Sequence, residues 1–270
     1  MIKIIGLQKH YKNLALHIDE YEFNSGKIYG IIGVNGSGKS TFLKSILGLI
    51  DYSGTIIIDN IDVKKNKMAL EPIGAIIETP AFINGLSARQ NLEYFLKDNK
   101  IAIEFLSQIG MDDYLDDLVR TYSIGMKQKL AFSVACAKGS KVIILDEPFS
   151  GMDKYSVKQC LSILKKLKEN GVLIIITSHD LDTISKICDE VCFLKKGQLL
   201  EFDEDETHDR IVLITCDSLE ECNEARRRLI SYEINMVDEN SFEIKLEKYT
   251  NNEEVKEILF GLNYSSKVME

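Results

Sequence analysis

Three apolar runs of strand length stand out along the chain. Ile28–Ile32, Val142–Leu145 and Val172–Thr177 are almost entirely apolar and rich in isoleucine. Continuous apolar runs of this length are typical of parallel strands buried on both faces. Apolar residues at helical spacing follow the first run and precede the third. The pattern therefore predicts an α/β core built around a buried sheet.

A second set of strands and a helical block flank this predicted core. Residues 2–8 and 14–23 alternate or cluster apolar residues around a polar turn, and Thr55–Asp59 gives another strand candidate. Over residues 86–118 the apolar positions recur at helical spacing, with Gly110 as the predicted helix stop. We therefore expect a β-rich flank and an inserted helical subdomain.

The C-terminal part, from about residue 208, has its own pattern. Ile211–Thr215 predicts a strand, and Ser218–Glu221 has the spacing of a capping box at the start of a helix. Residues 232–246 predict a hairpin, and Asn251–Leu262 predicts a last helix. This β-α-β-β-α unit contains no chemical motif.

Length and composition agree with an ordinary globular protein of two domains. The chain has 270 residues, of which 45% are hydrophobic and 28% charged. We expect a first domain over residues 1–205, with the helical subdomain at about 79–135, and a small second domain over 206–270.

Charge, cysteines and hydropathy bound the location and the partners. The formal net charge of −9 argues against nucleic acid as the main partner, since such domains are usually basic. The six cysteines form no CxxC pair, so we expect buried thiols in a reducing compartment rather than metal ligands or disulfides. No apolar run approaches the roughly 18 residues that span a bilayer, and Met1–Gly6 lacks a signal-peptide layout. We expect a cytoplasmic protein whose membrane role, if it has one, depends on a partner.

Gly33–Ser40 matches the phosphate-loop pattern G-x-x-x-x-G-K-[ST] at every fixed position. The predicted strand before it and the predicted helix after it are the context that this motif requires, which a glycine-rich turn with a chance lysine would lack. Its glycines let backbone N–H groups surround an anion, and the helix N-terminus adds positive charge. Lys39 would reach the β- and γ-phosphates, and the Ser40 hydroxyl would bind Mg²⁺. The expected nucleotide contacts are Gly33, Val34, Asn35, Gly36, Ser37, Gly38, Lys39, Ser40 and Thr41.

Polar residues also follow the two other buried runs. Asp146 and Glu147 come after the second run, and His179 comes shortly after the third. In open α/β sheets ligands bind at the carboxyl ends of the strands. Asp146 is therefore a candidate metal ligand, and Glu147 is a candidate for polarising an attacking water. His179 would contact a γ-phosphate or a nearby carboxylate.

Taken together, these motifs resemble the nucleotide-binding subunit of ATP-binding-cassette (ABC) transporters. The resemblance covers about residues 2–203. Gly33–Ser40 matches Walker A, and Val142–Glu147 matches Walker B with its catalytic glutamate. Tyr122–Met126 occupies the place of the family signature, with Ser123 and Gly125 at its most informative positions. The resemblance implies a P-loop NTPase fold of the ABC type, with a β-rich flank and an inserted helical subdomain on its α/β core.

The resemblance also assigns roles outside these three motifs. Ser150–Asp153 is similar to the D-loop, and His179 is similar to the switch histidine. Tyr11 lies where the family stacks an aromatic ring on adenine, a contact that contributes about 1–3 kcal/mol by analogy with base stacking.

Two positions depart from the common family pattern. The signature is YSIGM rather than LSGGQ, a form similar to that of many drug and peptide exporters. The Q-loop position holds Glu78 instead of glutamine, and we expect its carboxylate to approach the metal. The surrounding stretch, Ile73–Phe82, is similar to bacitracin-resistance and lantibiotic-immunity exporters, in which glutamate is usual.

The resemblance implies an ATPase that uses ATP and Mg²⁺. Two cassettes would face each other head to tail, so that ATP bound at Lys39 of one is completed by Ser123 of the other. The second cassette would be a copy of this chain or a different one.

The helical block would contact a membrane permease on a separate chain, which places the subunit on the inner face of the membrane. The resemblance makes antimicrobial peptides or drugs the expected exported substrates. A soluble ABC-type ATPase that acts on ribosomes or nucleic acid is the alternative, although such proteins usually carry two cassettes or long insertions. Another phosphate-loop enzyme, such as a kinase, would not explain the signature together with His179.

Overall fold

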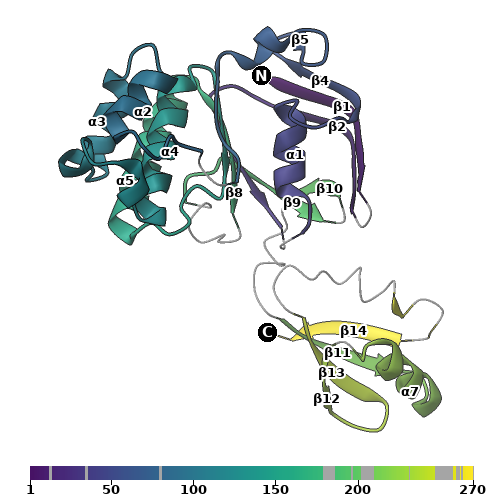
Figure 1. Ribbon diagram of the computed structural model, residues 1–270. Helices are drawn as coiled ribbons and strands as arrows, with labels where there is room; N and C mark the ends of the chain where they lie inside the picture. The colour runs from purple at the N-terminus through teal and green to yellow at the C-terminus, as the bar shows by residue number, and fades with distance from the viewer. Residues whose placement is uncertain are drawn as a thin grey trace. The chain divides into compact units, whose positions relative to one another are not determined.

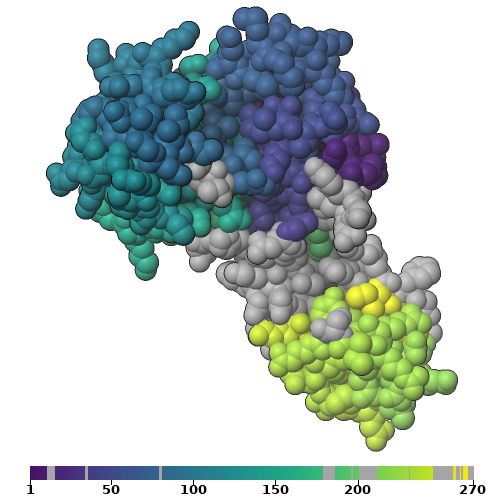
Figure 2. All heavy atoms as spheres, viewed as in Figure 1, coloured from purple at the N-terminus to yellow at the C-terminus, as the bar shows by residue number. Residues whose placement is uncertain are grey.

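The computed structural model divides into two compact units, Met1–Phe202 and Asp203–Glu270, which are treated separately below (Figures 1 and 2). The described residues are 1–11, 14–33, 36–78, 81–178, 186–195, 197–201, 210–230, 232–246, 258–259, 262 and 264–269.

A six-stranded sheet forms the centre of the first unit. Its order is β10-β9-β3-β8-β7-β6, and all neighbours are parallel except β10, which is antiparallel to β9. The three predicted apolar runs are the adjacent strands β3, β8 and β7, and every residue in them is buried. The strands are β3 (Ile28–Ile32), β6 (Ile73–Ile76), β7 (Val142–Asp146), β8 (Leu173–Ser178), β9 (Glu190–Lys195) and β10 (Gln198–Glu201).

The predicted β-rich flank is an antiparallel sheet of order β2-β1-β4-β5. One apolar core joins residues of this sheet to those of β3, β7 and β8, and Phe42, Leu43 and Ile46 of α1 lie in it. Helix α1 is thus enclosed between the two sheets, which fixes the position of its first turn (Figure 1). The elements are β1 (Ile2–Tyr11), β2 (Leu14–Phe23), β4 (Ser53–Ile58), β5 (Ile61–Asp62) and α1 (Lys39–Ile46).

A helical block lies to one side of the sheets of the first unit, as Figure 1 shows. Helices α2 and α3 pack on α4, and α4 packs on β6 so closely that a Cβ on Gly74 would lie 1.8 Å from the carbonyl oxygen of Ala135. Helix α5 packs on β8 and α4. The helices are α2 (Ala88–Phe95), α3 (Lys100–Gln108), α4 (Ile124–Lys138) and α5 (Lys154–Glu169), with 3-10 turns at Lys67–Leu70, Asp112–Tyr114 and Val119–Thr121.

Local sequence signals set several helix boundaries, and the predicted helix stop at Gly110 is confirmed. Ser123 caps α4, because its hydroxyl accepts a hydrogen bond from the Met126 N–H at 3.2 Å. Helix α3 ends before Gly110, which has a φ of 74°, and α5 ends before Gly171, which has a φ of 86°. The sequence pattern did not predict β6, β9 or β10.

The second unit contains a four-stranded antiparallel sheet of order β12-β13-β11-β14. Helix α7 connects β11 to β12, with β13 between them, which is a split β-α-β arrangement. The predicted strand, hairpin and N-cap Ser218 are confirmed. Strand β14 corrects the predicted β-α-β-β-α order, and most of the predicted helix Asn251–Leu262 lies outside the described residues. The elements are β11 (Arg210–Cys216), α7 (Leu219–Arg228), β12 (Glu233–Met236), β13 (Ser241–Leu246) and β14 (Tyr264–Met269).

No helix in the described part of the chain is long and apolar enough to cross a bilayer.

Candidate functional site

The phosphate-loop motif connects β3 to α1. The described glycines of this loop have conformations or surroundings that a side chain would disturb: Gly36 and Gly38 have φ values of 83° and 106°, and a Cβ on Gly33 would lie 2.6 Å from the carbonyl oxygen of Leu194. Gly38 is the N-cap of α1, so the N-terminal N–H groups of α1 begin directly after the loop. Val34 and Asn35 lie outside the described residues.

Lys39 begins α1, and its side chain bends back over the loop. The side chain is buried, and its Nζ donates a hydrogen bond to the carbonyl oxygen of Gly33 at 2.6 Å. Burial lowers the pKa of the Lys39 ammonium group below its ordinary value, and the charges of Glu147 and Asp146 act in the opposite direction. The lysine is thus a desolvated cation that faces the two strand-end carboxylates.

One polar atom inside the loop has no hydrogen-bond partner within the described chain. Ser37 is 7% exposed, and its hydroxyl oxygen is buried without a partner there. A buried hydroxyl is costly to leave unpaired, and a phosphate oxygen would satisfy it. The open glycine backbone, this hydroxyl and the Lys39 ammonium group together fit a triphosphate.

The ends of β7 and β8 form the second half of the site. Asp146 is 7% exposed, and its carboxylate accepts a hydrogen bond from the Thr177 hydroxyl at 2.6 Å. The same hydroxyl oxygen accepts from the Glu147 N–H at 3.1 Å. Gln128 of α4 donates to the Glu147 carbonyl oxygen at 3.5 Å. Thr177 therefore holds both acidic residues in place, a role that the sequence did not assign to it.

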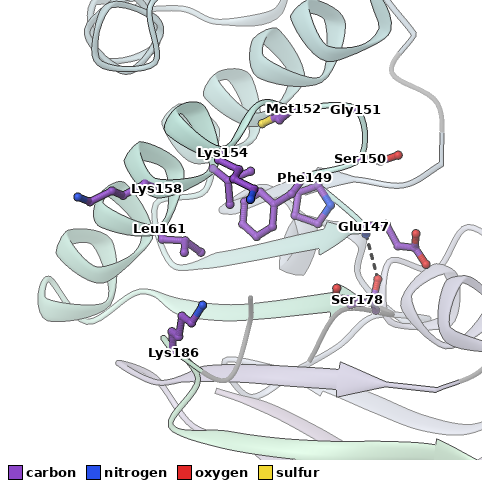
Figure 3. A pocket seen from close by; sticks show the side chains of 13 residues that line it. Glu147, Phe149, Ser150, Gly151, Met152, Lys154, Lys158, Leu161, Ser178 and Lys186 are labelled. Carbon is purple, nitrogen blue, oxygen red and sulfur yellow. Dashed lines mark hydrogen bonds between the residues drawn. The ribbon is translucent and has the colours of Figure 1, made fainter. Parts of the chain in front are cut away.

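Glu147 lies directly after β7 and leaves the extended backbone of the strand. Strand β7 ends at Asp146, and Glu147 has a φ of 45°, in the left-handed region. Non-glycine residues in this region carry strain and cluster at functional sites. Glu147 lines a hollow of about 700 Å³. Figure 3 shows it at one end of this hollow, with Lys154, Lys158 and Leu161 of α5 on the other side.

Glu78, two residues beyond the end of β6, is also a left-handed non-glycine residue, with a φ of 58°. It follows β6, the strand beside β7, but its carboxylate is engaged by α1. Lys44 Nζ lies 2.5 Å from Glu78 Oε1. In the described chain Glu78 is thus ion-paired, a contact that the sequence did not predict.

The signature residues lie at the N-terminus of α4. Ser123 is exposed there, whereas Gly125 is buried against the D-loop and a Cβ on it would lie 2.3 Å from the carbonyl oxygen of Gly151. Lys129 of α4 forms an ion pair at 3.0 Å with Asp153, which also caps α5 through the Ser156 N–H. Helix α4 and the residues after β7 are therefore held together at three points: Gly125, Gln128 and Lys129.

The other predicted site residues are Tyr11, His179, Ser40 and Thr41. Tyr11 closes β1 opposite Leu14, and nothing of its side chain is described. His179 lies outside the described residues. Ser40 and Thr41, in the first turn of α1, are half-buried.

Comparison with known proteins places this geometry in a family. A family model described as "ABC transporter" matches residues 16–150. An uncharacterised ABC transporter ATP-binding protein of Bacillus subtilis, YhcH, is 32% identical over 268 residues, which cover 92% of this chain and 85% of that protein. The chain belongs to the ABC transporter family. This cassette is an ATP-binding subunit with ATPase activity, and the predicted family and fold class are confirmed.

Other relatives of this cassette are named for the compounds that they transport. The bacitracin transport ATP-binding protein BcrA of Bacillus licheniformis is 37% identical, over 74% of this chain and 67% of that protein. The lantibiotic transport ATP-binding protein SrtF of Streptococcus pyogenes is 32% identical, over 74% of this chain and 89% of that protein.

Solved structures support the same fold. An ATP-binding subunit of an ABC transporter matches 96% of this cassette and 99% of that chain, with a TM-score of 0.69 and 21% identity. The dimeric cassette MJ0796 matches 74% of this cassette and 96% of that chain, with a TM-score of 0.67 and 24% identity. At these identities the likeness shows the fold alone.

Proposed function

We propose that this cassette drives an exporter of antimicrobial peptides, and that it does so as part of a cassette dimer on a separate membrane permease. The relatives named for bacitracin and lantibiotic transport support this substrate class. The observation that carries the dimer is the exposure of Ser123, a signature residue at the N-terminus of α4, where a neighbouring molecule can reach it. Helix N-termini favour anions, so this surface suits the γ-phosphate of a nucleotide bound to a second cassette.

Within one chain, different residues would bind the phosphates, the adenine ring and the metal ion of Mg·ATP. Lys39 and the backbone of Gly33–Thr41 would bind the phosphates, and Tyr11 would stack on adenine. Ser40 and Asp146 would hold Mg²⁺, with Glu78 as a further contact. Mg²⁺ usually binds through one or two carboxylates together with substrate phosphates, where it neutralises phosphate charge. These residues suit it, because Asp146 is a buried carboxylate fixed by Thr177.

Glu147 is the proposed general base. Its backbone is fixed on both sides, through the N–H to Thr177 and through the carbonyl oxygen to Gln128. The strained backbone therefore holds the side chain at the strand end, where it would orient a water for attack and accept its proton. His179 would contact the γ-phosphate from the end of β8.

An apolar groove supports the permease as partner. A hollow of about 460 Å³ lies between the end of α1, β6 and α4, and its lining includes Leu49, Phe82, Phe95 and Val134. Leu49 is 63% exposed and Phe95 is 39% exposed. An amphipathic helix can place its apolar face in a groove of this kind. Docking there would keep the cassette on the cytoplasmic face of the membrane.

Two experiments test this function. Glu147→Gln should bind ATP without turnover, so ATP should shift this variant from monomer to dimer in light scattering, and Ser123→Arg in the same background should prevent the shift. The proposed dimer would be contradicted if the ATP-bound variant stayed monomeric both alone and when mixed with each candidate for a different second cassette.

Purification of the native complex tests the partner. A polytopic membrane protein should co-purify, and Leu49→Glu should release it while leaving ATP binding intact. The alternative, a ribosome- or nucleic-acid-acting ATPase, is not favoured by the relatives named for transport; co-purifying RNA without a membrane protein would reverse this judgement.

A further inference from the structure

The ion pair between Lys44 and Glu78 joins two parts of the nucleotide site. Lys44 lies on α1, the helix that begins with Lys39 and Ser40, and Glu78 follows β6. Lys44 Nζ and Glu78 Oε1 are 2.5 Å apart. The carboxylate of the Q-loop position is therefore engaged by α1.

Glu78 follows a strand that neighbours the proposed metal site, which makes the metal a second partner for its carboxylate besides Lys44. Strands β6 and β7 are parallel, and Ile76 pairs with Leu145. Beyond this pair, β7 ends at Asp146 with Glu147 directly after it, and Glu78 lies two residues beyond the end of β6, the neighbouring strand. Neighbouring strands are about 4.8 Å apart, which a glutamate side chain can span. Helix α1 also packs on β7, so Lys44 and the proposed metal ligands Ser40 and Asp146 come from two elements in contact, and Glu78 follows the strand next to β7.

Charge and exposure make this pair separable. The side chain of Glu78 is 61% exposed and that of Lys44 is 28% exposed. Exposed ion pairs are weak, so a stronger local cation can displace one. The backbone at Glu78 is left-handed, with a φ of 58°, and non-glycine residues in this conformation cluster at functional sites.

We infer that Lys44 is a positioning residue: it holds the Glu78 carboxylate against α1 in the nucleotide-free cassette, and Glu78 exchanges Lys44 for the metal when Mg·ATP binds. The inference rests on the proposed Mg·ATP site. It follows that the Lys44–Glu78 pair competes with metal-dependent nucleotide binding. Binding of ATP without the metal leaves the pair in place.

A double-mutant cycle tests this competition. Lys44→Gln, Glu78→Gln and the double variant would be made in the full chain carrying Glu147→Gln, so that binding is measured without turnover. The readout is the dissociation constant of a fluorescent ATP analogue, measured once with Mg²⁺ and once with EDTA. Lys44→Arg keeps the charge and the ion pair, and Lys165→Gln removes one exposed positive charge from α5 as a control.

With Mg²⁺, Lys44→Gln should weaken binding less when Glu78 is present than in the Glu78→Gln background. The difference should be about two- to five-fold, as expected for a weak ion pair that must break. With EDTA the two effects should be the same within error. Lys44→Arg should match the parent, and Lys165→Gln should have the same effect in both backgrounds.

Two results would overturn the inference: no coupling in Mg²⁺, or equal coupling in Mg²⁺ and EDTA. The first would mean that the pair persists in the bound state, and the second that it has only a structural role. A parent chain that fails to bind the analogue at all would instead contradict the proposed nucleotide site, so the two failures are distinguishable.

Discussion

Thr177→Val removes a single hydroxyl that supports both acidic residues of the candidate site. Thr177 is fully buried, donates to Asp146 at 2.6 Å and accepts from the Glu147 N–H at 3.1 Å. Valine fills nearly the same volume, so the change leaves little cavity and acts through the two lost hydrogen bonds.

The expected cost follows from these two bonds. A hydrogen bond to a charged group contributes about 1.5–3 kcal/mol, and an unpaired buried N–H costs about 1–3 kcal/mol. The added methyl group returns about 0.8 kcal/mol. We therefore expect Thr177→Val to lower the free energy of unfolding by about 2–5 kcal/mol, which corresponds to a Tm about 4–20 °C lower for a unit of this size.

Thr177→Ser is the matched control. It keeps the hydroxyl and loses only a methyl group, so it should cost about 1 kcal/mol. Thermal unfolding of both variants gives the comparison, and the ATPase rate should fall further for Thr177→Val than for Thr177→Ser because Glu147 loses its anchor. If Thr177→Val is as stable and as active as Thr177→Ser, the hydroxyl does not hold the two acidic residues and the reasoning is wrong.

Three other variants probe the neighbouring elements. Glu147→Gln should retain ATP binding and lose about 10²–10⁴-fold in turnover, measured by phosphate release, since it removes the proposed general base; full turnover would exclude that role. Gly125→Ala should lower ATPase activity and Tm together, because its Cβ would lie 2.3 Å from the Gly151 carbonyl oxygen, and an unchanged Tm would mean that the backbone shifts freely. Hydrogen bonds from Ser156 hold the pKa of Asp153 below its ordinary value of 3.8, so the stability it contributes is present above that value and is lost as the pH falls through its folded pKa. Asp153→Asn should therefore differ most from the parent near neutral pH, and the difference in urea midpoint should shrink below about pH 4.

The strongest sequence signals predicted the three central strands of the six-stranded sheet. The strands β3, β7 and β8 were predictable because burial on both faces requires continuous apolar runs, and Ser123, Gly110 and Gly171 mark helix ends through local hydrogen bonding and backbone freedom. Strand β6 was not predictable. It has four residues, and its Gly74 is explained only by the approach of α4, a tertiary contact that no local pattern encodes.

The candidate site divides in the same way. The phosphate loop and Asp146–Glu147 were predictable, because their chemistry requires certain residue types at fixed spacing. Thr177, Gln128 and Lys44 were not assigned roles, since their contacts depend on which strands and helices become neighbours. A polar residue inside the third apolar run was the one available signal for Thr177, and it gains meaning only when β8 pairs with β7.

The pairing of β14 with β11 has a consequence for how the chain is made. Tyr264–Met269 hydrogen-bonds to Arg210–Cys216, so the sheet of the second unit is incomplete until residues close to 270 have left the ribosome. The first unit makes its contacts within Met1–Phe202 and can close while those residues are still being added, since domains generally fold as units during synthesis. One hydrogen-bonding edge of β11 then stays without its strand partner until a segment about fifty residues further along the chain has been translated.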